Sequence, residues 1–399
     1  MSKYFFFTAT LLGLLALFIP TAWYTALPLS QAVRDFPISG ILLLKTSLYL
    51  DAAFLLAIAV GYKKIMILGT EAQTPTLEKN NFHDKKQQFI IIFIVGVAAI
   101  LRFYRLDTDL WLDEVVTVNF SKHTLGELLS LYEGTNHHLL NTLLVKLSMI
   151  IFGDSEWAIR LPTAILGILT VPALFFLVRR AMGFWHAIAV AAILTVSYQH
   201  IYFSQNARGY ISHIFFSLIS TLYLLKSLKT NNRKHWLLFA MFSFLNMASL
   251  INSVFVVFSH GLICIISIWK KKNKLPTLIN STLSFSAVAL LTFNLYATII
   301  PQLLVLVKQV YSQKSTGFDF FSFEFLTEII NGLLAGFGAI VWLGLAILLV
   351  FVIAKACNIT YSLLIITFTF ITSVYNHKRP YYITPIFSIW YGNSLCKFN

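Results

Sequence analysis

Four short clusters of polar side chains stand out in a chain that is otherwise strongly apolar. The clusters are the carboxylate pair Asp113-Glu114, the imidazole pair His137-His138, the segment 204–210 (Ser-Gln-Asn-Ala-Arg-Gly-Tyr) and the segment 377–382 (His-Lys-Arg-Pro-Tyr-Tyr). Carboxylates and imidazoles are the usual acid–base groups of enzymes. Arg208 and Arg379 each lie where two apolar runs meet, and a cation in that position needs a partner or a function. These residue types suit chemistry at a membrane boundary.

The composition identifies the elements that must position these groups. Of the 399 residues, 58% are hydrophobic and 12% are charged, whereas an ordinary soluble domain carries roughly 25% charged residues. One core cannot bury so many apolar side chains, so lipid must surround most of the chain. The sequence therefore predicts an all-α polytopic membrane protein, and it excludes a soluble globular protein. The three cysteines are isolated in or beside apolar runs and predict neither a disulfide framework nor a metal site.

Twelve apolar stretches have about the length that a membrane-spanning helix needs, roughly 20 residues. We predict about twelve spans (10–13), at 5–26, 41–61, 89–104, 158–178, 184–203, 210–228, 235–252, 253–269, 278–300, 329–352, 358–376 and 380–395. The first is expected to be a retained helix, because no clear Ala-x-Ala cleavage site follows it. The two spans before residue 88 form an N-terminal extension (1–87), and the remaining residues form the main membrane domain (88–399).

The charges fall mainly on one side of these spans. If the N-terminus is cytoplasmic, the cytoplasmic loops receive 18 of the 30 basic residues and three of the 16 acidic ones, or +15. The opposite side then carries −1, and the two sides account for the formal net charge of +14. An excess of lysine and arginine in short cytoplasmic loops is the rule that sets membrane orientation. It therefore predicts a cytoplasmic N-terminus, and it removes the reason to expect a nucleic-acid partner.

The longest segment between spans, 105–157, lies on the outer side and holds eight acidic residues. Within it, apolar residues recur at helical spacing over 138–152, with Asn141, Lys146 and Ser148 between them. This pattern predicts an amphipathic helix on the bilayer surface, and a weaker pattern predicts a second one over 117–132. The outer segment should therefore form a platform that directly follows the Asp113-Glu114 pair.

Each polar cluster also has an ordinary structural interpretation. Asp113 and Glu114 could be a solvated loop pair or partners of Arg102 and Arg105, and a cation at a helix end could simply extend its head group to water. The predicted topology, however, places all four clusters on the outer face. Convergence of four such clusters from distant parts of the chain favours a functional site there.

At these residues the chain resembles the GT-C superfamily of polytopic glycosyltransferases, in the branch related to protein O-mannosyltransferases and lipid A aminoarabinose transferases. The resemblance covers roughly 88–392. It rests on four elements in the family's order: Leu-Asp-Glu at 112–114; His-His-Leu at 137–139 with Phe-Gly-Asp-Ser-Glu-Trp-Ala-Ile-Arg-Leu-Pro at 152–162; His-Ile-Tyr-Phe-Ser-Gln-Asn-Ala-Arg-Gly-Tyr at 200–210; and Lys-Arg-Pro-Tyr-Tyr-Ile-Thr-Pro at 378–385. The sequence departs from the pattern where His138 and Leu139 replace two prolines and where Asn206 replaces an acid, which puts the acceptor pocket in doubt more than the fold.

The resemblance implies an inverting transferase that moves a sugar from a polyprenyl-phosphate carrier to an acceptor hydroxyl on the outer membrane face. It implies that Asp113 is the catalytic base and that Glu114 supports it. Phosphate is a stable leaving group, so fixed positive charge is more useful than a general acid. The remaining roles are donor-phosphate binding by Arg208, Lys378, Arg379 and Tyr382, and orientation of acceptor or donor by His137, His138 and Gln205.

No cofactor is expected, although Asp113 and His137 could contribute to a divalent-metal site as a weaker alternative. The expected location is the bacterial inner (plasma) membrane, and the expected partners are the sugar donor, membrane lipid and an acceptor that is a glycan, a lipid or a protein. Two other interpretations remain open, a multi-span solute transporter and a truncated, inactive relative of the glycosyltransferases. The transporter is less favoured, because the polar clusters collect on one face and no internal repeat is evident.

Overall fold

The computed structural model describes residues 2–69, 85–132 and 137–313, and within these ranges it contains α-helices and no strand. The helices are α1 (Ser2–Phe18), α2 (Ala22–Thr25), α3 (Gln31–Arg34), α4 (Gly40–Leu68), α5 (Lys85–Phe103), α6 (Leu112–Lys122), α7 (Leu125–Ser130), α8 (Leu139–Phe152), α9 (Glu156–Met182), α10 (Phe184–Val196), α11 (Tyr198–Ser204), α12 (Tyr210–Thr230), α13 (Arg233–Ser249), α14 (Ser253–Trp269), α15 (Leu275–Tyr296) and α16 (Ile300–Gln313). The prediction of an all-α fold is confirmed for this part of the chain.

Five of these helices are long and apolar enough to cross a membrane: α4, α5, α9, α12 and α15. Helices α10 and α11 pass the same test together and meet at a bend of 61°, so the described ranges contain five or six candidate spans. The chain is therefore a multi-pass membrane protein. Helices α1, α13 and α14 coincide with three further predicted spans but have 17 residues each. The predicted spans 329–352, 358–376 and 380–395 lie outside the described residues, so the count of about twelve stays a prediction.

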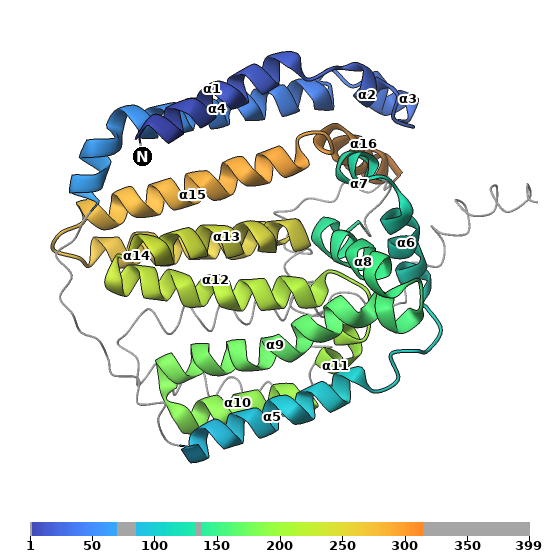
Figure 1. The fold of residues 1–399 in the computed structure, drawn as a ribbon, viewed down its shortest axis with the longest axis vertical. Helices are drawn as coiled ribbons and strands as arrows, with labels where there is room; N and C mark the ends of the chain where they lie inside the picture. Colours follow the sequence, from blue (N-terminus) through green and yellow to red (C-terminus); the bar gives the residue numbers. More distant parts are fainter. Residues whose placement is uncertain (1, 70–84, 133–136, 314–399) are drawn as a thin grey trace, which may run out of the picture. The chain divides into compact units, whose positions relative to one another are not determined.

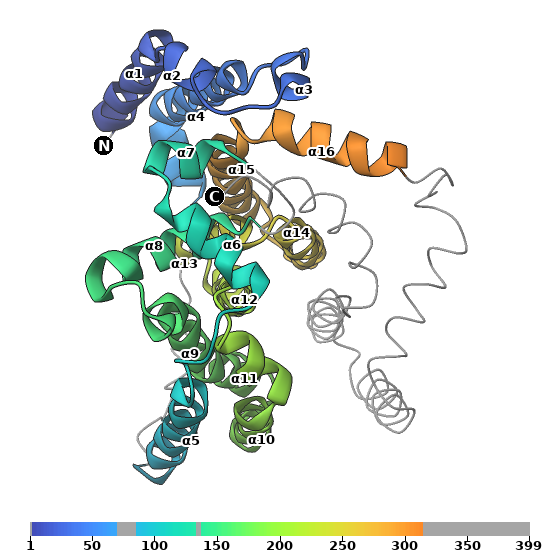
Figure 2. The ribbon, with the colours of Figure 1, turned by 90° about the vertical axis from the view of Figure 1, so that its right-hand side faces the viewer.

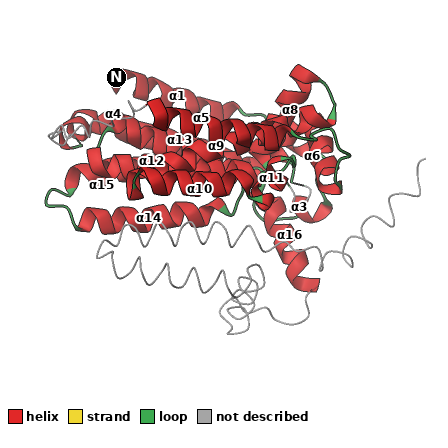
Figure 3. Cartoon of the chain, turned by 90° about the horizontal axis from the view of Figure 1, so that it is seen from below, coloured by secondary structure: helices red, strands yellow, loops and turns green. Residues whose placement is uncertain are grey.

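The long helices run side by side, with α9 between α12 and the pair formed by α5 and α10 (Figure 1). Small side chains allow this close packing: Ala98 of α5 and Ala187 and Ala191 of α10 are fully buried beside Val171 and Phe175 of α9. Close approach of helix backbones at small residues is the usual packing mode in membranes. The N-terminal hairpin of α1 and α4 lies on the side of α15 (Figures 1 and 2). Figure 3 shows the described residues as helices and connecting loops.

The short helices α6, α7, α8 and α11 gather at one end of the long helices (Figures 1 and 2). The polar clusters before α6, α8 and α12 share this end, as the alternating topology predicts. The opposite ends carry basic residues, among them Arg179 and Arg180 on α9, Lys229 on α12 and Arg233 on α13. The charge asymmetry of the sequence is therefore present between the two ends of the long helices.

The predicted amphipathic helix over 138–152 is confirmed as α8, and the weaker one over 117–132 is divided between α6 and α7. In α8 the polar residues Asn141 and Ser148 are buried, while Leu147, Ile150 and Ile151 are exposed. A helix in water would bury the opposite face. The exposed apolar face of α8 is therefore suited to contact lipid at the membrane boundary.

The topology predicts that the end bearing α6 and α7 lies outside the cell. In a background with Cys264, Cys357 and Cys396 replaced by serine, Lys122→Cys should react with a membrane-impermeant maleimide in intact cells, whereas Lys272→Cys should not. Both positions are exposed in the structure, and a permeant maleimide provides the control because it should label both. The reverse labelling pattern would invert the orientation.

Candidate active site

The carboxylate pair lies in the first turn of α6, where the partial positive charge of a helix N-terminus stabilises acidic side chains. Glu114 occupies the third position of the helix, and its Oε2 accepts a hydrogen bond from the backbone N–H of Trp111 at 3.0 Å. This is the carboxylate half of a capping box. Neighbouring residues on a helix point about 100° apart, so fixing Glu114 toward the protein leaves Asp113 pointing elsewhere.

Glu114 is fully buried and forms a two-point ion pair with Arg160 of α9. Arg160 Nε donates to Oε1 at 2.9 Å, and Nη2 donates to Oε2 at 2.7 Å. Oε1 also accepts the backbone N–H of Ala207 at 2.8 Å. A buried carboxylate is tolerated when its charge is paired and its oxygens are hydrogen-bonded, and Glu114 meets both conditions. Its role in this geometry is to hold other groups in place.

Arg160 also binds the backbone of the loop between α5 and α6. Its Nη1 donates to the carbonyl oxygens of Leu106 and Thr108, at 2.9 and 2.5 Å, and its Nη2 donates to that of Asp109 at 2.9 Å. The guanidinium group can make this many contacts because it has five donors in a fixed plane. The Glu114–Arg160 pair therefore joins α6, α9, the 104–111 loop and the segment before α12.

Asp113 forms an ion pair with Arg208, through Oδ2 and Nη1. The Asp113 side chain is 47% exposed, whereas that of Arg208 is 2% exposed. The Nη2 of Arg208 also donates to the hydroxyl of Tyr210 at 3.2 Å, and its guanidinium lies 5.3 Å from the centroid of that ring. The pair thus combines an accessible carboxylate with a buried cation that is also bonded to Tyr210.

The segment that carries Arg208 follows the bend between α10 and α11. A helix end leaves carbonyl groups without helical partners, and the buried Arg102 of α5 donates to those of Leu194 and Thr195, both at 3.2 Å. Arg102 Nη2 also lies 2.9 Å from His200 Nδ1 in α11. Arg102 therefore stabilises the bend that brings the segment 205–209 toward α6.

Gln205 and Gly209 fix the two ends of this segment. The side-chain amide of Gln205 donates to the carbonyl oxygens of Leu101 and Tyr104, at 3.0 and 2.7 Å, so it attaches the segment to the end of α5. A Cβ atom on Gly209 would lie 2.6 Å from the carbonyl oxygen of Ser249 and 2.9 Å from His138 Cβ. Only glycine fits this close approach.

The two histidines are both buried, and they have different neighbours. The His138 ring meets that of Tyr210 edge-on, with centroids 5.4 Å apart, and so lies beside the Arg208 segment. The His137 ring is stacked between Phe120, at 4.6 Å, and Tyr132, at 5.6 Å. Burial lowers the pKa of His137 to about 4, so its imidazole is neutral at physiological pH.

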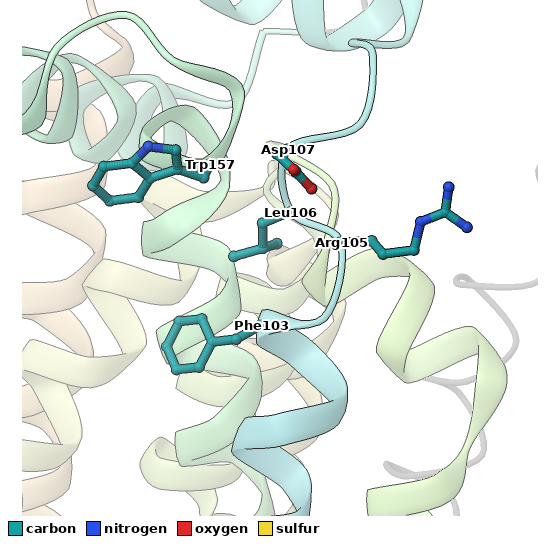
Figure 4. A pocket seen from close by; sticks show the side chains of 5 residues that line it. All are labelled: Phe103, Arg105, Leu106, Asp107 and Trp157. Atoms are coloured by element: carbon teal, nitrogen blue, oxygen red, sulfur yellow. The ribbon is translucent and has the colours of Figure 1, made fainter.

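An open hollow of about 400 Å³ lies on the outside of the 104–111 loop, lined by Phe103, Arg105, Leu106, Asp107 and Trp157 (Figure 4). Its lining residues do not include Asp113 or Arg208. The Arg105 side chain points away from Phe103 and Trp157. We place the candidate site at the Asp113–Arg208 pair, because that is where the charged groups from distant segments meet.

Six of the predicted site residues can be placed, and they are Asp113, Glu114, His137, His138, Gln205 and Arg208. Lys378, Arg379 and Tyr382 lie outside the described residues. Within the described ranges, no three His, Cys, Asp or Glu side chains meet as a metal site would require. The alternative in which Asp113 and Glu114 pair with Arg102 and Arg105 is replaced by the pairs with Arg208 and Arg160.

The sequence interpretation assigned no role in the site to Arg160, and it considered Arg102 only as a possible partner of the two carboxylates. Both could have been detected as cations within or beside an apolar span, a position that requires an acidic or carbonyl partner. The identity of the partners depends on the fold, because Arg160 and Glu114 are 46 residues apart in the chain.

Removing one partner of the Glu114–Arg160 pair should strongly reduce stability. Glu114→Leu leaves the Arg160 charge buried without its counterion and should cost about 3 to 5 kcal/mol, measured by unfolding in detergent micelles. Asp154→Asn, an exposed acid in the same outer segment, is the control and should have little effect. The double variant Glu114→Leu/Arg160→Met should be less destabilised than the sum of the single variants. Additive effects would contradict the pairing.

The stability of the protein should depend on pH through His137. The folded protein keeps this imidazole neutral down to a pKa of about 4, whereas a histidine in an unfolded chain has its ordinary pKa of about 6.5. The unfolded state therefore takes up a proton first as the pH falls, and stability is lost between about pH 6.5 and pH 4. His137→Phe should flatten this part of the curve of unfolding midpoint against pH. An unchanged curve would show that His137 does not contribute.

Comparison with known proteins finds a family match over part of the chain and a similar solved structure. Residues 136–299 match the family described as dolichyl-phosphate-mannose-protein mannosyltransferase. No curated protein matches the chain. Among solved structures, the chain is similar to the S. cerevisiae protein O-mannosyltransferase Pmt1-Pmt2 complex bound to the sugar donor, with 19% identity and a TM-score of 0.41. That similarity covers 64% of this chain and 36% of the yeast chain, so our chain spans about a third of its relative's length.

The matched region runs from the start of α8 to the end of α15 and includes His137, His138, Arg160 and Arg208. It therefore contains the cation of each carboxylate pair. Residues 136–299 of this chain are thus similar to the family described as dolichyl-phosphate-mannose-protein mannosyltransferase.

Proposed function

We propose that this protein is an inverting glycosyltransferase that moves a sugar from a polyprenyl-phosphate carrier to an acceptor hydroxyl at the outer face of the membrane. The observation that carries the proposal is the Asp113–Arg208 pair, an accessible carboxylate against a buried cation. The match of residues 136–299 to the dolichyl-phosphate-mannose-protein mannosyltransferase family supports a lipid-linked sugar as the donor.

In the proposed reaction the acceptor oxygen attacks the anomeric carbon from the face opposite the phosphate. The new carbon–oxygen bond forms as the bond between the anomeric carbon and the phosphate oxygen breaks, which inverts the configuration. The acceptor proton passes to the Asp113 carboxylate, and the bonding electron pair leaves with the polyprenyl phosphate. Asp113 can serve because half of its side chain is exposed while its backbone is fixed in the first turn of α6.

Positive charge near the departing phosphate is the second requirement. Arg208 fits it, because a guanidinium group has enough donors to hold Asp113 and also bind a phosphate oxygen. Its position is determined by Tyr210 and by the bend that Arg102 stabilises. Lys378, Arg379 and Tyr382 remain part of the proposed phosphate-binding set.

The roles of the other groups follow from their positions. His138 lies against Tyr210, next to the Arg208 segment, and is assigned to orientation of the acceptor or donor. His137 is a neutral ring held between two aromatic rings. The exposed apolar face of α8 supports a site at the lipid boundary, where a polyprenyl chain can remain in the bilayer while its phosphate reaches Arg208.

Asp113→Asn should lower the rate of sugar transfer by about a hundredfold or more, because positioned acid–base groups contribute about 10²–10⁴-fold. The assay uses proteoliposomes with a panel of radiolabelled polyprenyl-phosphate sugars and detects the product by its mass. Asp109→Asn, an exposed carboxylate in the preceding loop, is the matched control and should retain activity. Turnover like that of the wild type in Asp113→Asn would exclude Asp113 as the base.

A further inference from the structure

The turn between α15 and α16 binds the loop that follows α7. Gln302 is buried in the first turn of α16, directly after this connection. Its amide nitrogen donates to the carbonyl oxygen of Ser130 at 2.6 Å, and its Oε1 accepts the backbone N–H of Tyr132 at 2.8 Å. The hydroxyl of Thr298 donates to the carbonyl oxygen of Leu129 at 3.1 Å. Three backbone groups, two at the end of α7 and one in the loop after it, are therefore bonded to side chains about 170 residues away in the chain.

A glutamine is well suited to this position. The carbonyl of one residue and the N–H of the residue two further on are the pair that a neighbouring β-strand would bind. A primary amide offers one acceptor and two donors, so Gln302 satisfies both loop groups, and it also donates to the carbonyl oxygen of Thr298 at 3.1 Å. Without it, these buried backbone groups would lose their partners, which is costly.

The loop held in this way leads directly to the candidate site. Tyr132 forms one side of the aromatic stack around His137. Leu128, in α7 just before the loop, packs in one cluster with Leu139 of α8 and Ile299 of the turn. The position of the His137 ring therefore depends on the backbone that Gln302 holds.

The N-terminal extension reaches the same turn. The hydroxyl of Tyr24 donates to the carbonyl oxygen of Thr298 at 3.3 Å. This approach needs Gly40, because a Cβ atom there would overlap the Tyr24 hydroxyl and would lie 2.7 Å from the Thr298 oxygen. The extension is thus bonded to the turn that positions the loop.

We propose that Gln302 is a positioning residue for sugar transfer, and that Gln302, Thr298, Tyr24 and Gly40 form a corner brace that holds the Leu129–Tyr132 loop and, through it, His137. This inference rests on the proposed function, because the family resemblance implies that His137 orients a substrate of that reaction. Gln302 and the extension lie outside the family-matched residues 136–299. Three residues of the brace, Gln302, Tyr24 and Gly40, therefore lie outside the region that matches the family.

The test compares two volume-matched variants of buried amides in the full-length chain. Gln302→Met removes both bonds to the loop. Asn280→Leu, on α15, removes an amide that donates to the carbonyl oxygen of Gly69 at 2.9 Å, at the opposite end of the helix. Each is measured for hydrogen exchange of the Tyr132 amide, for modification of His137 by diethyl pyrocarbonate, and for kcat and KM of transfer.

We expect Gln302→Met to speed exchange at Tyr132, to expose His137 to the reagent, and to lower kcat/KM by about tenfold to a hundredfold, the cost of misplacing a site group. Asn280→Leu should change none of the three. If Gln302→Met fails to fold, Tyr24→Phe removes a single bond of the brace and should shift all three readouts in the same direction by less.

Unchanged exchange and modification in Gln302→Met would overturn the brace itself. Faster exchange with unchanged kcat and KM would overturn its positioning role. A wild-type protein that transfers no sugar from any polyprenyl-phosphate donor would refute the proposed function and the positioning role together. In that case the exchange and modification data still decide whether the brace exists.

Discussion

The buried ion pair between Glu114 and Arg160 is the interaction on which the candidate site depends. It joins two helices and two loops that the chain separates widely, and every oxygen of Glu114 has a partner within it. Such a pair adds little net stability over apolar packing, but breaking it is costly. Its contribution is therefore geometric: it fixes the first turn of α6 relative to the segment that carries Arg208.

This constraint explains why two adjacent carboxylates have different roles. The helix directs neighbouring side chains about 100° apart, so only one of the pair can point into the protein. Glu114 is buried and fully bonded, whereas Asp113 is half exposed and pairs with a cation. The buried carboxylate positions the helix turn, and the exposed one remains accessible to a substrate.

Much of this arrangement could be predicted from the sequence. Apolar length predicted the long helices α1, α4, α5, α9, α10, α12, α13, α14 and α15. The spacing in 138–152 predicted α8, and the alternation of spans predicted that Asp113, His138 and Arg208 share one end. The helices depend on local periodicity. The shared end depends only on whether the number of spans between two segments is odd or even. The bend between α10 and α11 was not predicted, because a continuous apolar run, 184–203, does not reveal that Arg102 bonds the carbonyl groups at its interruption.

The contacts that the sequence could not supply share one physical cause. Near a membrane boundary a loop has little access to water, so its backbone groups need partners from the protein. Arg102 bonds the end of α10, Arg160 bonds the 106–109 backbone, and Gln302 bonds the loop after α7. Each is a long polar side chain that serves a backbone far away in the chain, which only the fold can bring near. These three side chains therefore hold loops in place, which is why the exposed carboxylate of Asp113 can keep a defined position without being buried itself.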